Sequence, residues 1–70
     1  MNINSIKLLI KELLGKRVSL IVNMGRNKEE FYEGIVKKMY PFLFTVEVNK
    51  AIKSFTYSDI LTKDVIIKKI

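Results

Sequence analysis

The chain contains no cysteine and no histidine. Without cysteine it can form no disulfide and no thiolate metal site, which fits a reducing cytoplasm. Without histidine it lacks the commonest general base and the commonest zinc ligand. No nucleophile motif takes their place. The sequence therefore predicts a protein that is not an enzyme, with no catalytic residue, no cofactor and no metal site.

Long hydrophobic runs are also missing. No unbroken apolar run is longer than three residues, or six if Pro41 is counted, which is far short of the roughly 20 needed to cross a bilayer. The run Leu8-Leu9-Ile10 is followed at once by Lys11 and Glu12, so it does not make the apolar region of a secretory signal. We therefore expect a soluble cytoplasmic protein that does not bind membranes.

Acidic residues are few beside basic ones. Seven Asp and Glu oppose 13 Lys and Arg, and the formal net charge is +6. An excess of positive charge favours polyanionic partners such as nucleic acid. Eleven of the 13 cations are lysine, and isoleucine and asparagine are abundant, which is the composition that an AT-rich coding bias produces. The charge therefore permits nucleic-acid binding without requiring it.

Residues 5–14 have the spacing of an amphipathic helix. One apolar stripe recurs at i, i+3, i+4, i+7 and i+8, and it consists of Ile6, Leu9, Ile10, Leu13 and Leu14. Asn4 is a suitable N-cap, with Ile3 and Leu8 at the hydrophobic-staple positions, and Gly15 can end the helix. So short a helix is unstable alone. We expect it to plug one end of a sheet, and a partner-binding helix is the alternative.

The clearest strand begins at Phe42. Large apolar residues alternate there with polar ones, and a period of two marks a half-buried strand. The set predicted to be buried is Phe42, Phe44, Val46 and Val48. Thr45 and Glu47 are predicted to face water. Pro41, which has no N–H to donate, suits the turn before the strand.

Four further strands complete the prediction, at residues 17–23, 28–39, 54–57 and 65–70. Gly25 supplies the turn between the first two, and Gly34 marks a bulge or a sharp bend in the second. Residues 49–52 form a connection, and Ser58 or Asp59 caps a single helical turn before the last strand. One helix and five short strands with turns at this spacing predict a mainly β fold with an N-terminal helix, a small barrel.

Several segments of the chain resemble the Veg family. They are Leu14-Gly15-Lys16-Arg17-Val18, residues 23–28, Gly34, Tyr40-Pro41, Phe44-Thr45-Val46 and residues 54–62. The resemblance covers nearly the whole chain. Its most specific parts are the Gly-Arg turn, the Tyr-Pro step and the Ser-Phe-Thr-Tyr-Ser-Asp-Ile-Leu-Thr block. Asn27 departs from the family pattern, which usually has a basic residue there, and so the turn carries one charge fewer.

The resemblance implies a single Veg-like domain over residues 1–70, a five-stranded SH3/Sm-like barrel with the helix at about 5–14 and the barrel at about 16–70. Veg-like proteins are small cytoplasmic proteins of Gram-positive bacteria that stimulate biofilm formation by relieving a transcriptional repressor of matrix genes. The family brings no catalytic activity, no cofactor and no established functional residues. We therefore expect a regulatory protein that contacts a protein partner. A nucleic-acid-binding barrel, acting through a basic face, is the alternative.

Six cations are candidates for contacts with a partner or with nucleic acid: Lys16, Arg17, Arg26, Lys28, Lys37 and Lys38. The turn from Gly25 to Lys28 can hold a phosphate through backbone N–H groups and a guanidinium, or it is a solvated hairpin tip. Lys16 and Arg17 can instead complement the dipole of the preceding helix. Lys37 and Lys38 can instead protect a strand edge. A shared basic face requires these groups to meet in space.

The last strand is apolar on both faces. A 70-residue domain buries only about 60% of the surface that its unfolded chain exposes, so self-association would enlarge its core. The candidates for a subunit interface are Val65, Ile66, Ile67 and Ile70. The N-terminal helix is the other element that can cover them.

Overall fold

The computed structural model describes residues 2–70 and begins with helix α1, Ile3–Leu13. Its N-cap is Asn2, whose side chain accepts a hydrogen bond from the backbone N–H of Ser5 at 2.9 Å. The prediction of Asn4 as the cap was therefore wrong, and the helix starts two residues earlier than expected. Leu14 has already left the helix, because Gly15 follows with a φ of +76°.

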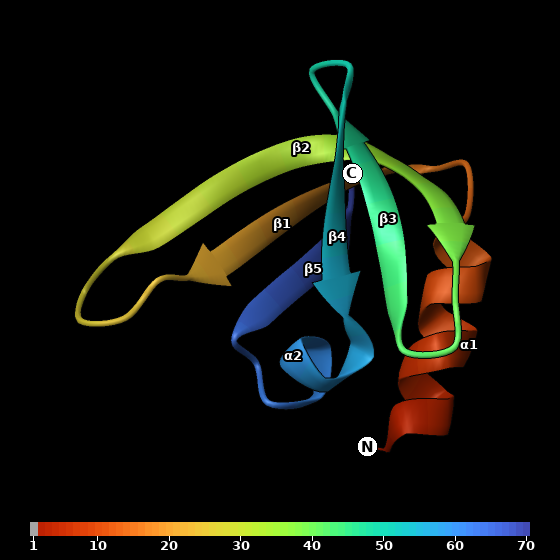
Figure 1. Cartoon of the computed structure of the whole chain (residues 1–70), viewed down its shortest axis with the longest axis horizontal. Coiled ribbons are helices and arrows are strands. Elements are labelled where there is room, and N and C mark those ends of the chain that lie inside the picture. Colours follow the sequence, from red (N-terminus) through yellow and green to blue (C-terminus); the bar gives the residue numbers. More distant parts are fainter. Residues whose placement is uncertain (1) are drawn as a thin grey trace.

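Five antiparallel strands form one sheet: β1 (Arg17–Asn23), β2 (Glu29–Met39), β3 (Leu43–Val48), β4 (Ala51–Thr56) and β5 (Val65–Lys69). Their order across the sheet is β4-β3-β2-β1-β5. The prediction of a mainly β fold with one N-terminal helix is confirmed. The long strand β2 curves over the others and belongs to both halves of the sheet (Figure 1). The sheet is not closed, because β4 and β5 form its two edges.

Strand β3 lies where the alternation places it, except at its start. Phe44 and Val46 are fully buried and Val48 is nearly so, as predicted. Phe42 was predicted to join them and is 83% exposed, because it belongs to the turn before the strand. Thr45 was predicted to face water and is buried. Its hydroxyl oxygen accepts a hydrogen bond from the backbone N–H of Lys38 at 3.2 Å, where the register between β2 and β3 shifts.

The β3–β4 connection is tighter than expected. Asn49 and Lys50 have φ values of 51° and 68°, and a two-residue turn with both φ values positive matches the twist of a hairpin. The predicted connection over residues 49–52 was therefore too long, and β4 begins at Ala51. The short helix α2, Tyr57–Leu61, follows β4 directly. Its cap is Thr56, whose hydroxyl accepts from the backbone N–H of Asp59 at 3.1 Å, so the prediction of Ser58 or Asp59 was wrong.

One core joins the sheet and both helices. From α1 it takes Ile6, Ile10 and Leu13, as the stripe predicted, while Leu14 is exposed. The sheet and α2 contribute the other buried apolar residues: Val18, Leu20, Val36, Phe44, Val46, Val48, Phe55, Tyr57, Ile60 and Val65. Helix α1 lies beside the end of β2 and the start of β3, on the side away from the β1–β2 turn (Figure 1). The end of β2 therefore lies beside α1, whereas its start, at the β1–β2 turn, lies away from that helix.

Candidate partner-binding surface

The β1–β2 turn is a polar loop whose backbone N–H groups form hydrogen bonds within the loop itself. Gly25 has a φ of +106°, and Asn27 also has a positive φ, of 51°. The backbone N–H of Gly25 donates to Oδ1 of Asn23 at 3.0 Å, and that of Lys28 donates to the carbonyl of Gly25 at 3.0 Å. Two of the N–H groups that could face a ligand are therefore already used inside the turn.

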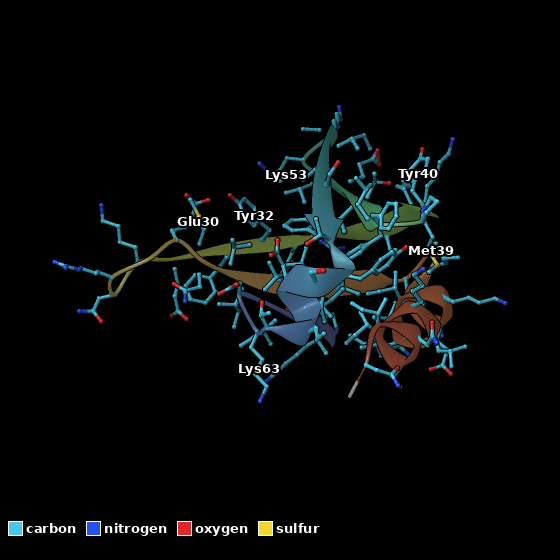
Figure 2. All side chains as sticks on the ribbon, turned by 60° about the horizontal axis from the view of Figure 1, so that its bottom comes forward. Glu30, Tyr32, Met39, Tyr40, Lys53 and Lys63 are labelled. Atoms are coloured by element: carbon cyan, nitrogen blue, oxygen red, sulfur yellow. The ribbon has the colours of Figure 1, made fainter. Side chains whose placement is uncertain are left out.

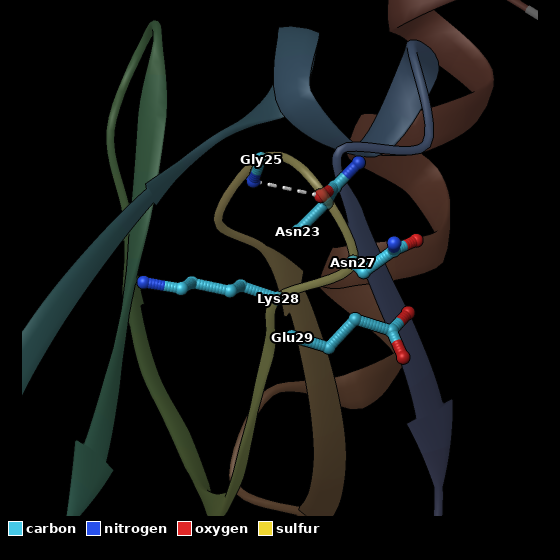
Figure 3. Close-up of a pocket in the computed structure, with 5 residues that line it drawn as sticks. All are labelled: Asn23, Gly25, Asn27, Lys28 and Glu29. Carbon is cyan, nitrogen blue, oxygen red and sulfur yellow. Dashed lines mark hydrogen bonds between the residues drawn. The ribbon is translucent and has the colours of Figure 1, made fainter.

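A shallow hollow of about 450 Å³ lies at this turn, lined by Asn23, Gly25, Asn27, Lys28 and Glu29. Lys28 and Glu29 point to opposite sides, and the carboxylate of Glu29 lies on the side of Asn27 (Figure 3). A phosphate site needs donors and positive charge that converge. Here a carboxylate shares the hollow with amide groups, so the turn does not form such a cradle.

The six candidate cations fall into two groups. Arg26 and Lys28 lie at the β1–β2 turn, and the other four lie at the opposite end of the hairpin: Lys16, Arg17, Lys37 and Lys38. The length of β1, about 20 Å at 3.4 Å per residue, separates the two groups. In the second group Arg17 pairs with Glu33 and Lys37 pairs with Glu47, each at 3.7 Å. Four of the six thus lie at one end of the hairpin, and two of these four are paired with carboxylates.

The residues predicted for a subunit interface alternate between two faces of β5. Val65 is buried and Ile67 is half-buried, and both pack on the core of the same chain. Ile66 and Ile70 are exposed on the opposite face. The strand is therefore covered on one side only, and α1 does not cover the other.

The concave side of the sheet carries a polar cluster where β2 and β4 approach each other. The phenol of Tyr32 donates a hydrogen bond to the Glu30 carboxylate, and Nζ of Lys53 lies 4.7 Å from the centre of the Tyr32 ring. All three side chains lie on the same side of the molecule (Figure 2). The hydrogen bond to Glu30, partial desolvation and the nearby negative charge raise the pKa of Tyr32. Tyr32 therefore contacts both charged groups, Glu30 through its hydroxyl and Lys53 through its ring.

The turn between β2 and β3 presents two aromatic side chains to solvent. The backbone N–H of Tyr40 donates to the carbonyl of Leu43 at 2.7 Å and closes the turn around Pro41. The phenol of Tyr57 donates to the carbonyl of Tyr40 at 2.7 Å and fixes the turn to α2. Phe42, held in this turn, is the most exposed of the large apolar side chains over residues 2–70. A rigid, exposed aromatic ring is a common anchor in protein interfaces.

A groove of about 410 Å³ runs beside Phe42. It is lined by Ile3, Lys7, Pro41, Phe42, Thr56, Tyr57 and Ser58. These residues come from the start of α1, the β2–β3 turn and the start of α2. Lys7 is the charged residue among them, and its Nζ lies 5.5 Å from the centre of the Tyr57 ring. The groove therefore combines apolar walls with one ammonium group and no carboxylate.

A second hollow is lined in part by Tyr40. It measures about 320 Å³ and is lined by Lys37, Lys38, Tyr40, Thr45 and Ile52. Tyr40 and Met39 lie close to α1 at one end of the molecule (Figure 2). Each of the two exposed aromatics thus borders a hollow that contains lysine, and we call the pair the aromatic ridge (Tyr40 and Phe42). It suits a partner segment with apolar and acidic side chains.

Sequence reasoning assigned Phe42 to the core and did not single out Lys7. The sequence does contain a signal that places Phe42 outside the strand. Pro41 at the second position of a turn makes the next residue part of that turn, and so the strand cannot begin before Leu43. No local signal marks the groove, because its three walls are distant in sequence.

Comparison with known proteins gives one family. The family model described as "Biofilm formation stimulator VEG" matches residues 1–68 of the chain. A search of the curated proteins found no match. None of the helices over residues 2–70 is long and apolar enough to cross a membrane.

Proposed function

The chain belongs to the VEG family of biofilm formation stimulators, and from this premise we propose that it is a non-enzymatic cytoplasmic regulator that binds a transcriptional repressor of matrix genes. In this mechanism the regulator occupies the repressor by protein–protein contact and lowers the amount that is free to bind DNA. Phe42 is the observation that carries the proposal: a large aromatic side chain 83% exposed in a turn fixed at both ends.

The groove beside Phe42 determines what kind of segment fits. Apolar walls favour a partner segment with at least one large apolar side chain, which can pack between Phe42 and Ile3. Lys7 favours a carboxylate next to that side chain, because no acidic residue lines the groove to compete for the ammonium group. We therefore expect the repressor to contribute a short segment with neighbouring apolar and acidic residues.

The test is a binding titration of the purified repressor against this protein, by calorimetry or fluorescence. Phe42→Ala should weaken binding at least tenfold, as expected for an interface anchor. Lys7→Met should weaken it by a few fold and remove most of its dependence on salt. Phe31→Ala is the matched control, because it truncates another exposed phenylalanine, 70% exposed on β2. It should leave the affinity unchanged.

Two outcomes would overturn the proposal. One is the absence of binding at concentrations up to about 100 μM, which corresponds to a free energy weaker than about −5.5 kcal/mol. The other is a Phe42→Ala variant that binds as tightly as the Phe31→Ala control. In a strain that lacks the gene, restoration of biofilm by Phe42→Ala to the wild-type level would also exclude the aromatic ridge as the functional surface.

A further inference from the structure

The outer face of the half-sheet β2-β1-β5 carries a row of apolar side chains. Ile21 of β1 is paired with Phe31 of β2 on one side and with Ile66 of β5 on the other. Directly paired residues of antiparallel strands point to the same face. Val18 and Leu20 point into the core, so Ile21 and its two partners point outward. Phe31 is 70% exposed and Ile66 is 39% exposed.

The same face has two further rows of paired residues, and they differ in polarity from the first. The next row is polar: Ser19 lies between Glu33 of β2 and Lys68 of β5. In the third row Arg17 is paired with Ile35, and its carbonyl accepts a hydrogen bond from the N–H of Ile70 at 3.1 Å. Strand β2 therefore presents an apolar, an acidic and an apolar residue in turn. On the other side of β1, at the same heights, lie the apolar Ile66 and the basic Lys68 of β5 and the apolar Ile70 that follows the strand.

We propose that this face binds the same face of a second copy of the chain, with β2 of each copy over β5 of the other. A twofold axis parallel to β1 produces this arrangement and keeps every row opposite itself. Phe31 then packs on Ile66 of the second copy, and Ile35 packs on its Ile70. Glu33 faces Lys68 of the second copy, and this pair occurs twice because the interface is symmetric. We call this surface the outer face (β2-β1-β5).

The charges select this axis over the other one that a face-to-face dimer allows. An axis perpendicular to the strands, passing through the middle row, would place β2 over β2 and would bring Glu33 opposite Glu33 of the second copy. Like charges across an interface are unfavourable. With the parallel axis the middle row instead brings Glu33 opposite Lys68. Glu29 then lies nearest to Asp64 of the other copy, at the edge of the face and beyond the apolar row. The Asp64 carboxylate accepts a hydrogen bond from the Thr62 hydroxyl at 2.9 Å within its own loop.

Other occupants fit this face less well. Nucleic acid requires a surplus of cations. Here Arg17 is paired with Glu33 at 3.7 Å, and Ser19 of β1 is the residue that separates Lys68 from Glu33 in their row. Pairing of edge strands would instead use the free side of β5, which ends in Lys68 and Lys69, and lysines on an edge discourage such pairing. Three strands make a narrow surface, so we expect a dimer that forms and dissociates with concentration rather than a permanent one.

The test is analytical ultracentrifugation of the purified chain from about 1 μM to about 1 mM, the range that covers affinities from micromolar to millimolar. The expected result is a monomer–dimer equilibrium. Phe31→Ser should weaken the dimer at least tenfold. Phe42→Ser is the matched control, because it changes another exposed phenylalanine, 83% exposed against 70% for Phe31, outside the outer face. It should leave the monomer–dimer equilibrium unchanged.

A charge exchange tests the axis itself. Glu33→Lys and Lys68→Glu, made separately, should each weaken the dimer about tenfold or more, because each places two like-charged pairs across the interface. The double variant restores opposite charges and should recover the wild-type equilibrium to within about threefold. Circular dichroism checks that every variant is folded. A monomer at all concentrations, a dimer insensitive to Phe31→Ser, or a double variant no better than the single ones would each overturn the proposal.

Discussion

Gly34 of β2 lies against the backbone carbonyl of Glu47 in β3. A Cβ atom at Gly34 would overlap that carbonyl oxygen and would lie 2.8 Å from Cγ1 of Val46 and 2.9 Å from Cγ2 of Val48. Pairing between β2 and β3 starts at the next residue, where Ile35 is opposite Glu47. On its other side Gly34 is still paired with Val18 of β1. The missing side chain is what lets β2 pass from one half of the sheet into the other at this point.

Gly34→Ala should therefore destabilise the fold strongly. The new methyl group meets backbone, which cannot move aside as a flexible side chain can, so we expect a loss of more than about 3 kcal/mol in the free energy of unfolding. Urea denaturation followed by circular dichroism measures it. Gly15→Ala is the control, because that position has open space and only a positive φ of +76°, which costs about 1–2 kcal/mol. Equal losses in the two variants would contradict the steric explanation.

The helix cap gives a second prediction, which separates the observed from the expected start of α1. Asn2→Ala removes the oxygen that accepts from the N–H of Ser5 and should lower the free energy of unfolding by about 1 kcal/mol. Asn4 is exposed in the first turn and caps nothing, so Asn4→Ala should stay within about 0.5 kcal/mol of the wild type. Thermal denaturation of both variants decides between them. If Asn4→Ala lowers the free energy of unfolding more than Asn2→Ala does, Asn4 rather than Asn2 is the N-cap.

The helix cap and Gly34 also show how far the fold can be predicted from the sequence. Strand β1 was predicted with the bounds that it has, because its side chains alternate. Strand β2 was predicted to within one residue at its start, because the turn at Gly25 and the turn at Pro41 bound it. The helix start was missed because Asn2 and Asn4 offer the same capping chemistry two positions apart. Gly34 was expected to mark a bulge or a bend. The register shift lies beyond it, between Val36 and Lys38, and the close approach of β3 cannot be read from one strand.

The candidate site was less predictable than the fold. The six cations were chosen by residue type, and residue type does not say that β1 holds Arg26 about 20 Å from Arg17. The groove beside Phe42 requires α1, the β2–β3 turn and α2 to meet. Their meeting depends on contacts between distant segments, such as the hydrogen bond from Tyr57 to Tyr40. The period-two pattern also started the third strand one residue too early, at Phe42, because hydrophobic alternation alone does not account for a turn formed at Pro41.

Tyr57 gives a prediction on pH. Burial, with 2% of the residue exposed, raises its pKa, and the hydrogen bond to the Tyr40 carbonyl lowers it by a smaller amount. Because the folded pKa lies above the unfolded value of about 10, the folded state holds the proton more tightly. The stabilisation is present below pH 10 and is lost as pH rises through the folded pKa. The free energy of unfolding should therefore fall as the pH rises above about 10.

Tyr57→Phe provides the comparison for that pH dependence. At neutral pH the variant should lose about 1 kcal/mol, because the Tyr40 carbonyl loses its hydrogen bond. Above pH 10 its stability should fall less steeply than that of the wild type, because Phe has no proton to lose. Urea denaturation at several pH values measures both effects. Parallel curves for the two proteins would mean that other groups control the alkaline transition.

The last prediction concerns the nucleic-acid alternative. A continuous patch of six cations would give a slope of log K against log salt of about −4 on single-stranded DNA, since each neutralised phosphate contributes about −0.7. The structure separates Arg26 and Lys28 from the other four and pairs Arg17 and Lys37 with carboxylates. We therefore expect weak binding with a slope between about −1 and −2. Fluorescence anisotropy between about 50 and 200 mM salt, with mixed RNA and DNA oligonucleotides, measures it.

Variants identify which cations contribute to that slope. Arg26→Ala should reduce its magnitude by about 0.7 if the arginine meets a phosphate. Arg17→Ala should change it less, because the guanidinium is already paired with Glu33 at 3.7 Å. A slope near −4, reduced by similar steps in both variants, would require the two groups of cations to contact one strand together. The strand would then have to follow the whole length of β1, and nucleic acid rather than a repressor would be the better candidate for the partner.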